Sequence, residues 1–236
     1  MSRRLPDKGF NDTMWTPFYN WVEAHYPDDL GTMYIDGRLD RDFAKTEESV
    51  VLWERRTREY VDVVRAVNTA TAFVEAYATF DVDQAASYLA SDADLWLGDL
   101  EELQLENRLL QAQGFRLLLD SCEHRTTTSD GIVVGCSWDF HAIRSDEMGL
   151  GPFTGSRFDL TVREEEIVAA SMNWAYIDEF SPQVWGPFSQ WVTDTYPEDV
   201  DVMYLPAYAN YRLTEESIAL WEQRSREYAD AVLAGQ

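Results

Sequence analysis

Hydrophobic side chains recur along the chain with two different periods. Residues 46–64 and residues 67–80 carry apolar side chains at intervals of three and four, which predicts two amphipathic helices. Residues 82–89 predict a further short helix, and residues 100–119 are rich in helix-forming side chains. Over residues 132–140 apolar side chains occupy every second position, which predicts a strand with one apolar face.

Shorter strand signals occur at residues 94–97, 158–162 and 167–177. Helices that come first and an antiparallel meander that follows are typical of an α+β fold, with helices covering one face of a curved sheet. Asp130-Gly131 is a hairpin signal. With these as the two loop residues, Cys136 pairs with Arg125 and Cys122 with Asp139, so the two cysteines face opposite ways and a disulfide is not expected.

The two ends of the chain resemble each other. Aligning residues 15–64 with residues 185–232 gives 23 identities among 48 aligned pairs, with one gap of two residues. In each copy a short helix that starts at a proline is followed by a longer helix that starts at Thr-Glu-Glu. Solenoids usually need three or more adjacent repeats, so two copies around a unique centre indicate a different organisation.

We interpret the chain as three parts. Residues 1–65 form a helical segment, residues 66–180 an α+β domain, and residues 181–236 a C-terminal helical extension of which the first segment is a duplicate. Aromatic side chains of residues 1–64 would leave a large apolar surface in water if they had no neighbour. We therefore expect this segment to dock on the domain or on a neighbouring subunit.

Composition and charge restrict the class of protein. Hydrophobic residues make up 45% of the chain and there are nine Trp, which excludes intrinsic disorder. The formal net charge of −24 makes nucleic acid and anionic membrane surfaces poor partners. The start of the chain lacks the apolar stretch of a secretory signal, and no apolar run approaches the roughly 20 residues that cross a bilayer. We expect a cytoplasmic protein.

Three stretches together resemble the nuclear transport factor 2-like superfamily: residues 72–96, residues 130–143 and residues 156–180. That group includes ketosteroid isomerases, polyketide cyclases, scytalone dehydratase and limonene-epoxide hydrolase. The resemblance covers roughly residues 66–180. It implies a cone formed by a bent sheet wrapped around helices, with a pocket at the open end. The same fold carries many chemistries, so the resemblance implies a fold and no particular activity.

The catalytic residues of ketosteroid isomerases do not carry over. The alignment puts Phe73 where that family has its oxyanion-hole tyrosine and Leu97 near its aspartate base, and the acidic oxyanion partner falls near Ser156 or Arg157. A ketosteroid isomerase is therefore disfavoured. No Asp-Arg-Asp arrangement indicates epoxide hydrolysis either.

Four polar side chains are candidates for proton transfer, and each has a structural alternative. Tyr77 lies on the apolar stripe of its helix, where its hydroxyl either lines a pocket or is bonded within the core. Asp99 is either a general base or the N-cap of the helix that starts at Leu100. Asp139 and His141 share a strand face, where they form an acid–base pair or a solvated or dimer-contact surface.

Six aromatic side chains could line a pocket for a flat or apolar molecule, although core packing explains them equally well. They are Phe73, Trp138, Phe140, Phe158, Trp174 and Tyr176. Three His and two Cys without the usual ligand spacings indicate no metal site. The glycine motifs that bind phosphates and dinucleotides are also missing from the sequence, so we expect no cofactor.

Two functions stay open. The first is a protein whose pocket binds a small hydrophobic molecule, with an isomerase, cyclase or dehydratase reaction based on proton transfer as its chemistry. The alternative is a non-catalytic domain whose sheet face and aromatic helical tails mediate protein association. For either, we expect a homodimer through the sheet face that carries Val133, Ser137, Asp139 and His141.

Overall fold

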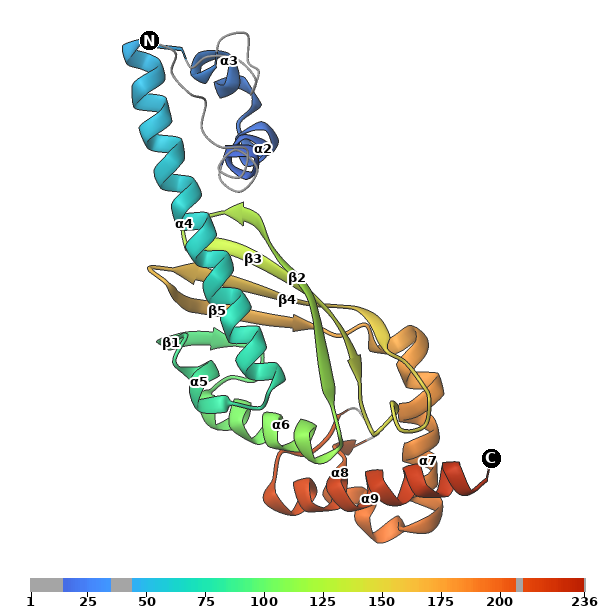
Figure 1. The fold of residues 1–236 in the computed structure, drawn as a ribbon. Helices are drawn as coiled ribbons and strands as arrows, with labels where there is room; N and C mark the ends of the chain where they lie inside the picture. The colour runs from blue at the N-terminus through green and yellow to red at the C-terminus, as the bar shows by residue number, and fades with distance from the viewer. Residues whose placement is uncertain (1–14, 35–43, 207–209, 236) are drawn as a thin grey trace. The chain divides into compact units, whose positions relative to one another are not determined.

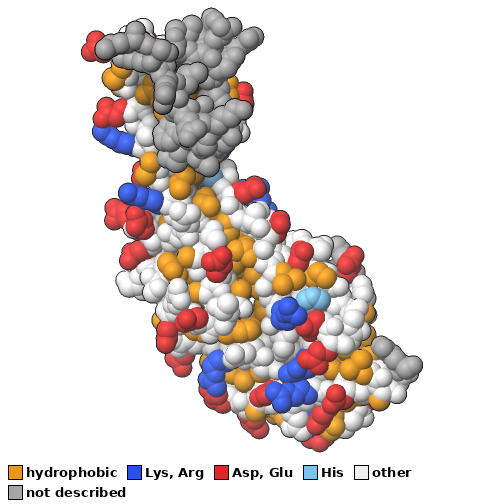
Figure 2. Space-filling view, viewed as in Figure 1, with side chains coloured by type: hydrophobic (Ala, Val, Ile, Leu, Met, Phe, Trp, Pro, Cys, Tyr) orange, Lys and Arg blue, Asp and Glu red, His pale blue; other side chains and the backbone are white. Residues whose placement is uncertain are grey.

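The computed structural model describes residues 15–34, 44–206 and 210–235. The chain divides into two units, Met1–Arg65 and Ala66–Gln236, and each is described by itself. Within the described residues, no helix is both long enough and apolar enough to cross a membrane. On the face drawn in Figure 2, acidic side chains are spread widely over the surface and do not gather in one patch.

A curved, open sheet of five strands forms the centre of the second unit (Figure 1). Its strands are β1 (Leu89–Leu95), β2 (Arg116–Thr127), β3 (Ile132–His141), β4 (Phe153–Arg163) and β5 (Glu166–Asn173). Their order across the sheet is β1-β5-β4-β3-β2. β1 is parallel to β5 and the other neighbours are antiparallel. The α+β class predicted from the sequence is confirmed.

The core lies between one face of this sheet and the helices. The alternation predicted over residues 132–140 is observed: Val134, Cys136, Trp138 and Phe140 of β3 are buried, and the residues between them are mostly half-buried. Cys136 pairs with Phe158 of β4, whose ring lies 5.7 Å from that of Tyr77. Tyr77 belongs to α4 (Glu47–Ala78), so this helix supplies the layer that covers the sheet face.

α4 is a single helix of 32 residues, where the sequence predicted one helix ending at residue 64 and another beginning at residue 67. The prediction of a break was wrong because no glycine or proline lies between residues 47 and 78 to end the first helix. α5 (Val82–Ala86) and α6 (Leu100–Ala112) follow in the second unit.

The helix predicted over residues 100–119 is shorter than expected. α6 ends at Ala112, because Gly114 adopts a left-handed conformation with φ of +73°. The amide of Phe115 then donates to the carbonyl of Leu110 and the amide of Gly114 to that of Gln111, which is the Schellman arrangement for ending a helix. The leucines that follow belong to β2, where Leu117 is buried and Leu118 is exposed.

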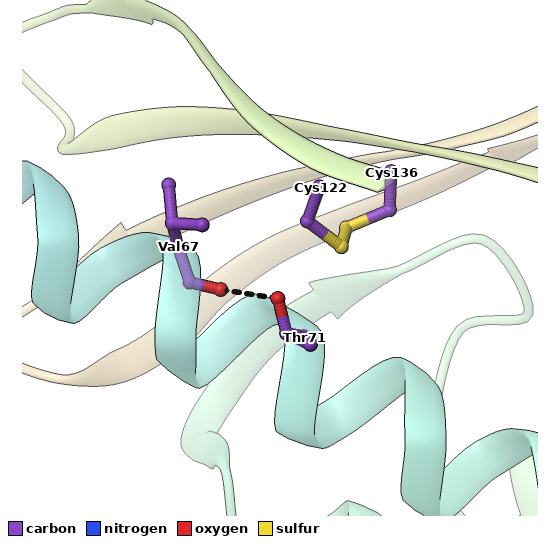
Figure 3. The surroundings of a disulfide bond; sticks show 4 residues. All are labelled: Val67, Thr71, Cys122 and Cys136. Atoms are coloured by element: carbon purple, nitrogen blue, oxygen red, sulfur yellow. Dashed lines mark hydrogen bonds between the residues drawn. A yellow bond between two sulfur atoms is a disulfide. The ribbon is translucent and has the colours of Figure 1, made fainter. Parts of the chain in front are cut away.

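The predicted register of the β2–β3 hairpin was also wrong. Thr127 pairs with Ile132 across a four-residue turn, and an irregularity between His124 and Thr126 shifts the pairing by one further residue. Cys122 therefore lies opposite Cys136, and the two form a disulfide (Figure 3). The expectation that the two cysteines face opposite ways and form no disulfide is corrected.

The rear copy, residues 185–232, consists of helices that follow the π-helical segment η4 (Tyr176–Trp185). They are α7 (Gly186–Thr195), η5 (Pro197–Asp199), α8 (Val200–Met203) and α9 (Glu215–Ala234). In the first unit, the front copy, residues 15–64, has the same order of elements. These are α2 (Thr16–His25), η2 (Pro27–Asp29), α3 (Leu30–Met33) and the first half of α4.

The two copies also repeat their contacts. Arg56 pairs with Asp29 at 2.6 Å in the front copy, and Arg224 pairs with Asp199 at 2.7 Å in the rear copy. Each guanidinium lies over the ring of a tyrosine, 3.4 Å and 3.5 Å from its centroid. The indole of Trp53 donates to the carbonyl of Met33, and the indole of Trp221 donates to that of Met203. Similar sequences thus give the same small helical fold twice.

Candidate functional site

A cavity of about 320 Å³ lies in the second unit, between the sheet, α6 and the segment that precedes α9. Most of its wall is aromatic or aliphatic, with three polar side chains and Tyr211 among the lining residues. The lining residues are Trp96, Leu97, Glu106, Gln113, Ala142, Met172, Trp174, Phe180, Trp185, Asn210 and Tyr211. This volume is near the lower end of the range for small-molecule sites.

Among the described residues that line this cavity, Glu106 is the charged one. It belongs to α6 and is 3% exposed. Its Oε1 accepts a hydrogen bond from the hydroxyl of Tyr211 at 2.7 Å. Its Oε2 accepts from the hydroxyl of Tyr77 and from the indole Nε1 of Trp96, both at 3.0 Å. The carboxyl group thereby joins α4, α6, the loop after β1 and the rear extension.

Burial decides how this cluster titrates. Loss of hydration raises the pKa of the Glu106 carboxyl above its ordinary value, although the hydrogen bonds from Tyr211, Trp96 and Tyr77 act in the opposite direction. Burial, together with the nearby Glu106 charge, raises the pKa of Tyr77 and that of Tyr211 well above 10.0. Both hydroxyls therefore stay protonated and act as donors, while Glu106 has a higher proton affinity than a carboxyl in water.

Aromatic rings hold the opposite part of the wall in place. Trp174 packs edge-on against Trp138, with 5.4 Å between the ring centroids, and against Phe140 at 5.2 Å. Phe140 in turn packs against Phe180 at 5.2 Å. Since neither Trp138 nor Phe140 reaches the cavity, they form a second layer that fixes the rings in front of them.

The four residues predicted for proton transfer lie in different places. Tyr77 is buried behind Glu106 and bonds to it. Asp99 caps α6, because its Oδ1 accepts from the amide of Glu102 at 2.9 Å. Asp139 borders a separate polar depression of about 440 Å³ together with Ser137.

His141 ends β3, where its Nδ1 lies 3.0 Å from the carbonyl oxygen of Leu150 and 3.3 Å from Oγ of Ser145. Of the four candidates, Tyr77 is the one whose described hydrogen bond goes to a side chain that lines the cavity. Catalytic roles for Asp99, Asp139 and His141 stay predictions.

The predicted ligand-binding aromatics divide into core and wall. Phe73, Trp138, Phe140 and Phe158 are at most 1% exposed and pack in the core. Trp174 lines the cavity. The side chain of Tyr176 lies outside the part of the chain that the structure describes.

Glu106, Trp96 and Tyr211 are not among the site residues predicted from the sequence. A signal for Glu106 was present, since it falls between Leu103 and Leu110 on the apolar stripe of its helix, where a charged side chain needs a partner. Tyr211 gave no such signal. It comes from a loop of the rear copy, 105 residues away from Glu106 along the chain.

No protein-family model matches the chain, and no curated protein matches it. Solved structures of similar fold exist. A nuclear transport factor 2-like protein of unknown function from Cytophaga hutchinsonii is 10% identical, with a TM-score of 0.34, over 47% of this chain and 90% of its own. A candidate polyketide cyclase from Xanthomonas campestris is 16% identical, with a TM-score of 0.37, over 48% of this chain and 92% of its own.

A protein of unknown function from Mycobacterium tuberculosis is 8% identical, with a TM-score of 0.38, over 75% of this chain and 93% of its own. Nuclear transport factor 2-like proteins are thus among the solved structures that this chain resembles. Likenesses this weak carry no argument about activity. What the chain does has to be inferred from its own residues.

Proposed function

We propose that the chain binds a small, largely apolar molecule in the cavity over Glu106. The observation that supports this is the combination of an aromatic wall with a buried carboxyl group in one cavity of about 320 Å³. A purely structural glutamate needs no space beside it. Here Glu106, Gln113 and Asn210 all reach the same cavity, so they can orient a ligand through a small number of polar contacts.

Proton transfer is the chemistry that these groups suit best. A carboxyl whose pKa is raised by burial is a better general acid than one in water, and its conjugate base is stronger. The hydroxyl of Tyr211 stays protonated beside it, and by giving up its hydrogen bond to Glu106 it can donate instead to an oxygen atom that gains negative charge. An isomerase, cyclase or dehydratase reaction would use these two functions together. In this proposal Glu106 moves the proton and Tyr211 stabilises the charge.

Binding can be tested by filling the cavity. Ala142 is 2% exposed and lines the cavity, so Ala142→Leu puts three additional carbon atoms into the space. Affinity for the neutral fluorescent probe N-phenyl-1-naphthylamine should fall by about tenfold, because overpacking a closed site costs about 1–3 kcal/mol. Ala219→Leu, the same change on an exposed position of α9, is the matched control and should leave affinity unchanged.

Native mass spectrometry of the purified protein provides the second readout, since a bound molecule adds its mass to that of the chain. If Ala142→Leu does not fold by circular dichroism, Leu97→Trp fills another part of the wall. Equal probe affinity in wild type and in a folded cavity variant would contradict the binding proposal.

The chemistry is tested separately from binding. A molecule recovered from the protein is incubated with the wild type in D₂O and examined for deuterium bound to carbon. Glu106→Gln keeps the size of the side chain and removes its proton-transfer capacity, so exchange should fall by at least about a hundredfold, in line with typical general acid–base contributions. Equal exchange in the two proteins would contradict proton transfer by Glu106 and would leave the binding proposal standing. The alternative, a non-catalytic association domain, would be favoured if neither the probe nor a co-purified molecule occupied the cavity.

A further inference from the structure

The buried carboxyl group of Glu106 has no counterion. Its two oxygens accept hydrogen bonds from Tyr77, Trp96 and Tyr211, and these three donors are neutral. The described residues that line the cavity include no lysine, arginine or histidine. Within the part of the chain that the structure describes, no cationic side chain forms an ion pair with Glu106.

The other buried acidic side chain of the described residues differs in this respect. Asp199 is 9% exposed, and its carboxylate pairs with Arg224 at 2.7 Å. An arginine is also available close to Glu106 in sequence, but Arg108 pairs with Glu215 on α9 instead. Since a buried charge is costly without a partner of opposite sign, the lack of one at Glu106 needs an explanation.

The contacts of Glu106 suit its ionised form. Each described partner donates to it, whereas a protonated carboxyl group would have to donate a hydrogen itself. Oε2 accepts two hydrogen bonds and Oε1 accepts one, so Oε1 can accept from a further donor. Burial raises the pKa of the Glu106 carboxyl, and no neighbouring positive charge lowers it again. A cation in the cavity would supply that charge.

The wall of the cavity suits a cation as well. Its described aromatic side chains are Trp96, Trp174, Phe180, Trp185 and Tyr211. The face of an aromatic ring is negative, and groups of such rings, tryptophan above all, bind ammonium groups. The cavity thus combines an aromatic surface for a cation with an acceptor for its N–H group.

We propose that the molecule bound over Glu106 is a protonated amine with an apolar body, whose ammonium group lies beside Glu106. This inference rests on the binding function proposed above and names the class of ligand. A neutral apolar molecule would contact the same wall but would leave the charge of Glu106 uncompensated. An anionic ligand would be repelled by that charge. The net charge of −24 further favours the approach of cations.

The test compares two molecules of the same shape. The amine is para-(dimethylaminomethyl)benzyl alcohol, which is protonated at neutral pH. Its neutral counterpart, para-isobutylbenzyl alcohol, has a C–H group in place of the N⁺–H group. Each is titrated into the full-length protein with bound N-phenyl-1-naphthylamine, and loss of probe fluorescence reports displacement. Sodium chloride at about 0.3 M screens attraction of the amine to the acidic surface.

The amine should bind about tenfold or more tightly than the neutral alcohol, because only the amine gains from the aromatic rings and the carboxylate as a cation. Glu106→Gln keeps the size of the side chain and removes its charge. In this variant the affinity for the amine should fall by about tenfold, while that for the neutral alcohol changes little. Glu101→Gln, the same change on an exposed position of α6, is the matched control and should keep the preference for the amine.

A second variant tests the aromatic wall without changing Glu106. Trp174→Leu removes an indole from the cavity and should reduce the preference for the amine by about threefold, the lower range for a cation–aromatic contact. Circular dichroism checks that both variants fold. If Glu106→Gln does not fold, Trp174→Leu decides between the two ligand classes.

The outcomes separate this inference from the binding function. If both molecules displace the probe with equal affinity, the cavity binds neutral ligands and the amine proposal is wrong, although the binding function stands. A preference for the amine that persists in folded Glu106→Gln would also overturn it, because the cation would then lie elsewhere. If neither the probe nor either molecule binds by isothermal titration calorimetry, both proposals are wrong.

Discussion

Glu106 is the side chain on which the proposed binding site and its chemistry depend. It is nearly inaccessible to water, accepts three hydrogen bonds, and borders a cavity. Burying a carboxyl group is unfavourable unless donors replace its hydration, and here two hydroxyls and an indole do so. Tyr211, the donor from the rear extension, makes the site depend on that extension, so the proposed binding site is a property of the whole second unit.

The first prediction concerns the pH dependence of stability. The folded state raises the pKa of Glu106 above its ordinary value of 4.5, so between these two pKa values the folded chain binds more protons than the unfolded chain. The contribution of Glu106 to stability therefore falls as pH rises through that interval. Glu106→Gln removes this contribution. The difference in thermal midpoint, wild type minus variant, should decrease from about pH 4.5 upwards.

Other titrating groups are common to wild type and variant, so the difference between their pH profiles isolates Glu106. Glu101→Gln, the same change on an exposed glutamate of the same helix, is the matched control. A flat difference for Glu106→Gln would mean that Glu106 has the same proton affinity in the folded and unfolded chain.

The second prediction is that Tyr77→Phe destabilises the fold although the ring still packs. It removes one of the three donors to a buried carboxyl group, and a hydrogen bond to a charged group contributes about 1.5–3 kcal/mol. Urea unfolding at neutral pH measures the loss. Tyr88→Phe, which removes a hydroxyl 3.4 Å from the amide of Gln84 on the surface, should cost less than about 0.5 kcal/mol. Equal losses for the two variants would contradict the importance of the Glu106 cluster.

At the scale of elements, periodicity predicted where helices and strands form better than it predicted where they end. The alternation over β3 and the helical spacing of α4 could both be predicted from the sequence, because each pattern follows from which side chains face the core. The end of α6 depended on one glycine in a left-handed conformation, and the leucines on both sides of it suit either structure. Leu117 belongs to a strand because it pairs with β3, and this pairing joins residues that are far apart in the sequence.

The cysteine pairing shows why register is harder to predict than periodicity. The longer turn and one irregularity in β2, between His124 and Thr126, put Cys122 opposite Cys136, and no local pattern announces such a bulge. The site was equally non-local. The stripe position of Glu106 could be predicted from its helix, but its partners come from α4, from the loop after β1 and from the rear copy, so only the tertiary fold brings them together.

The third prediction tests the Cys122–Cys136 disulfide as an element of the hairpin. The bond joins residues 14 apart in sequence and lies beside Val67 and Thr71 of α4 (Figure 3). Closing a loop of about 15 residues stabilises a fold by up to about 3 kcal/mol, through the entropy of the unfolded chain. Thermal unfolding in the presence of a reducing agent should therefore give a lower midpoint for the wild type than unfolding without it. The double variant Cys122→Ala/Cys136→Ala should start lower and not respond to the reducing agent.

Free-thiol titration of the unfolded protein gives the matching chemical readout. No free thiol is expected before reduction and two are expected after it. Two free thiols in protein purified without reductant would contradict the disulfide.

On the scale of the whole molecule, charge governs how the chain meets its surroundings. The homodimer expected through the sheet face with Ser137 and Asp139 stays a prediction, and it would bring two chains of net charge −24 together. Such a dimer should form more readily as salt screens this repulsion. Light scattering at low and high salt would detect it, and a monomer at both salt concentrations would count against it.

The last prediction is that salt also stabilises the folded monomer. Dividing the accessible surface of 13559 Å² among 24 net charges gives a mean spacing of about 24 Å, between the Debye lengths of about 30 Å at 0.01 M salt and about 10 Å at 0.1 M. Repulsion between neighbouring acidic groups thus acts at low salt and is screened at moderate salt. The thermal midpoint should rise by several degrees between about 0.01 M and about 0.3 M sodium chloride, the range over which the Debye length falls below this spacing.

Attractive pairs act in the opposite direction, but Arg56–Asp29 and Arg224–Asp199 are largely shielded from solvent and should be screened little. Sodium chloride is preferred to sulfate, which stabilises most proteins by exclusion from their surface. A midpoint that falls with added sodium chloride would show that exposed ion pairs such as Arg108–Glu215 outweigh the acidic excess.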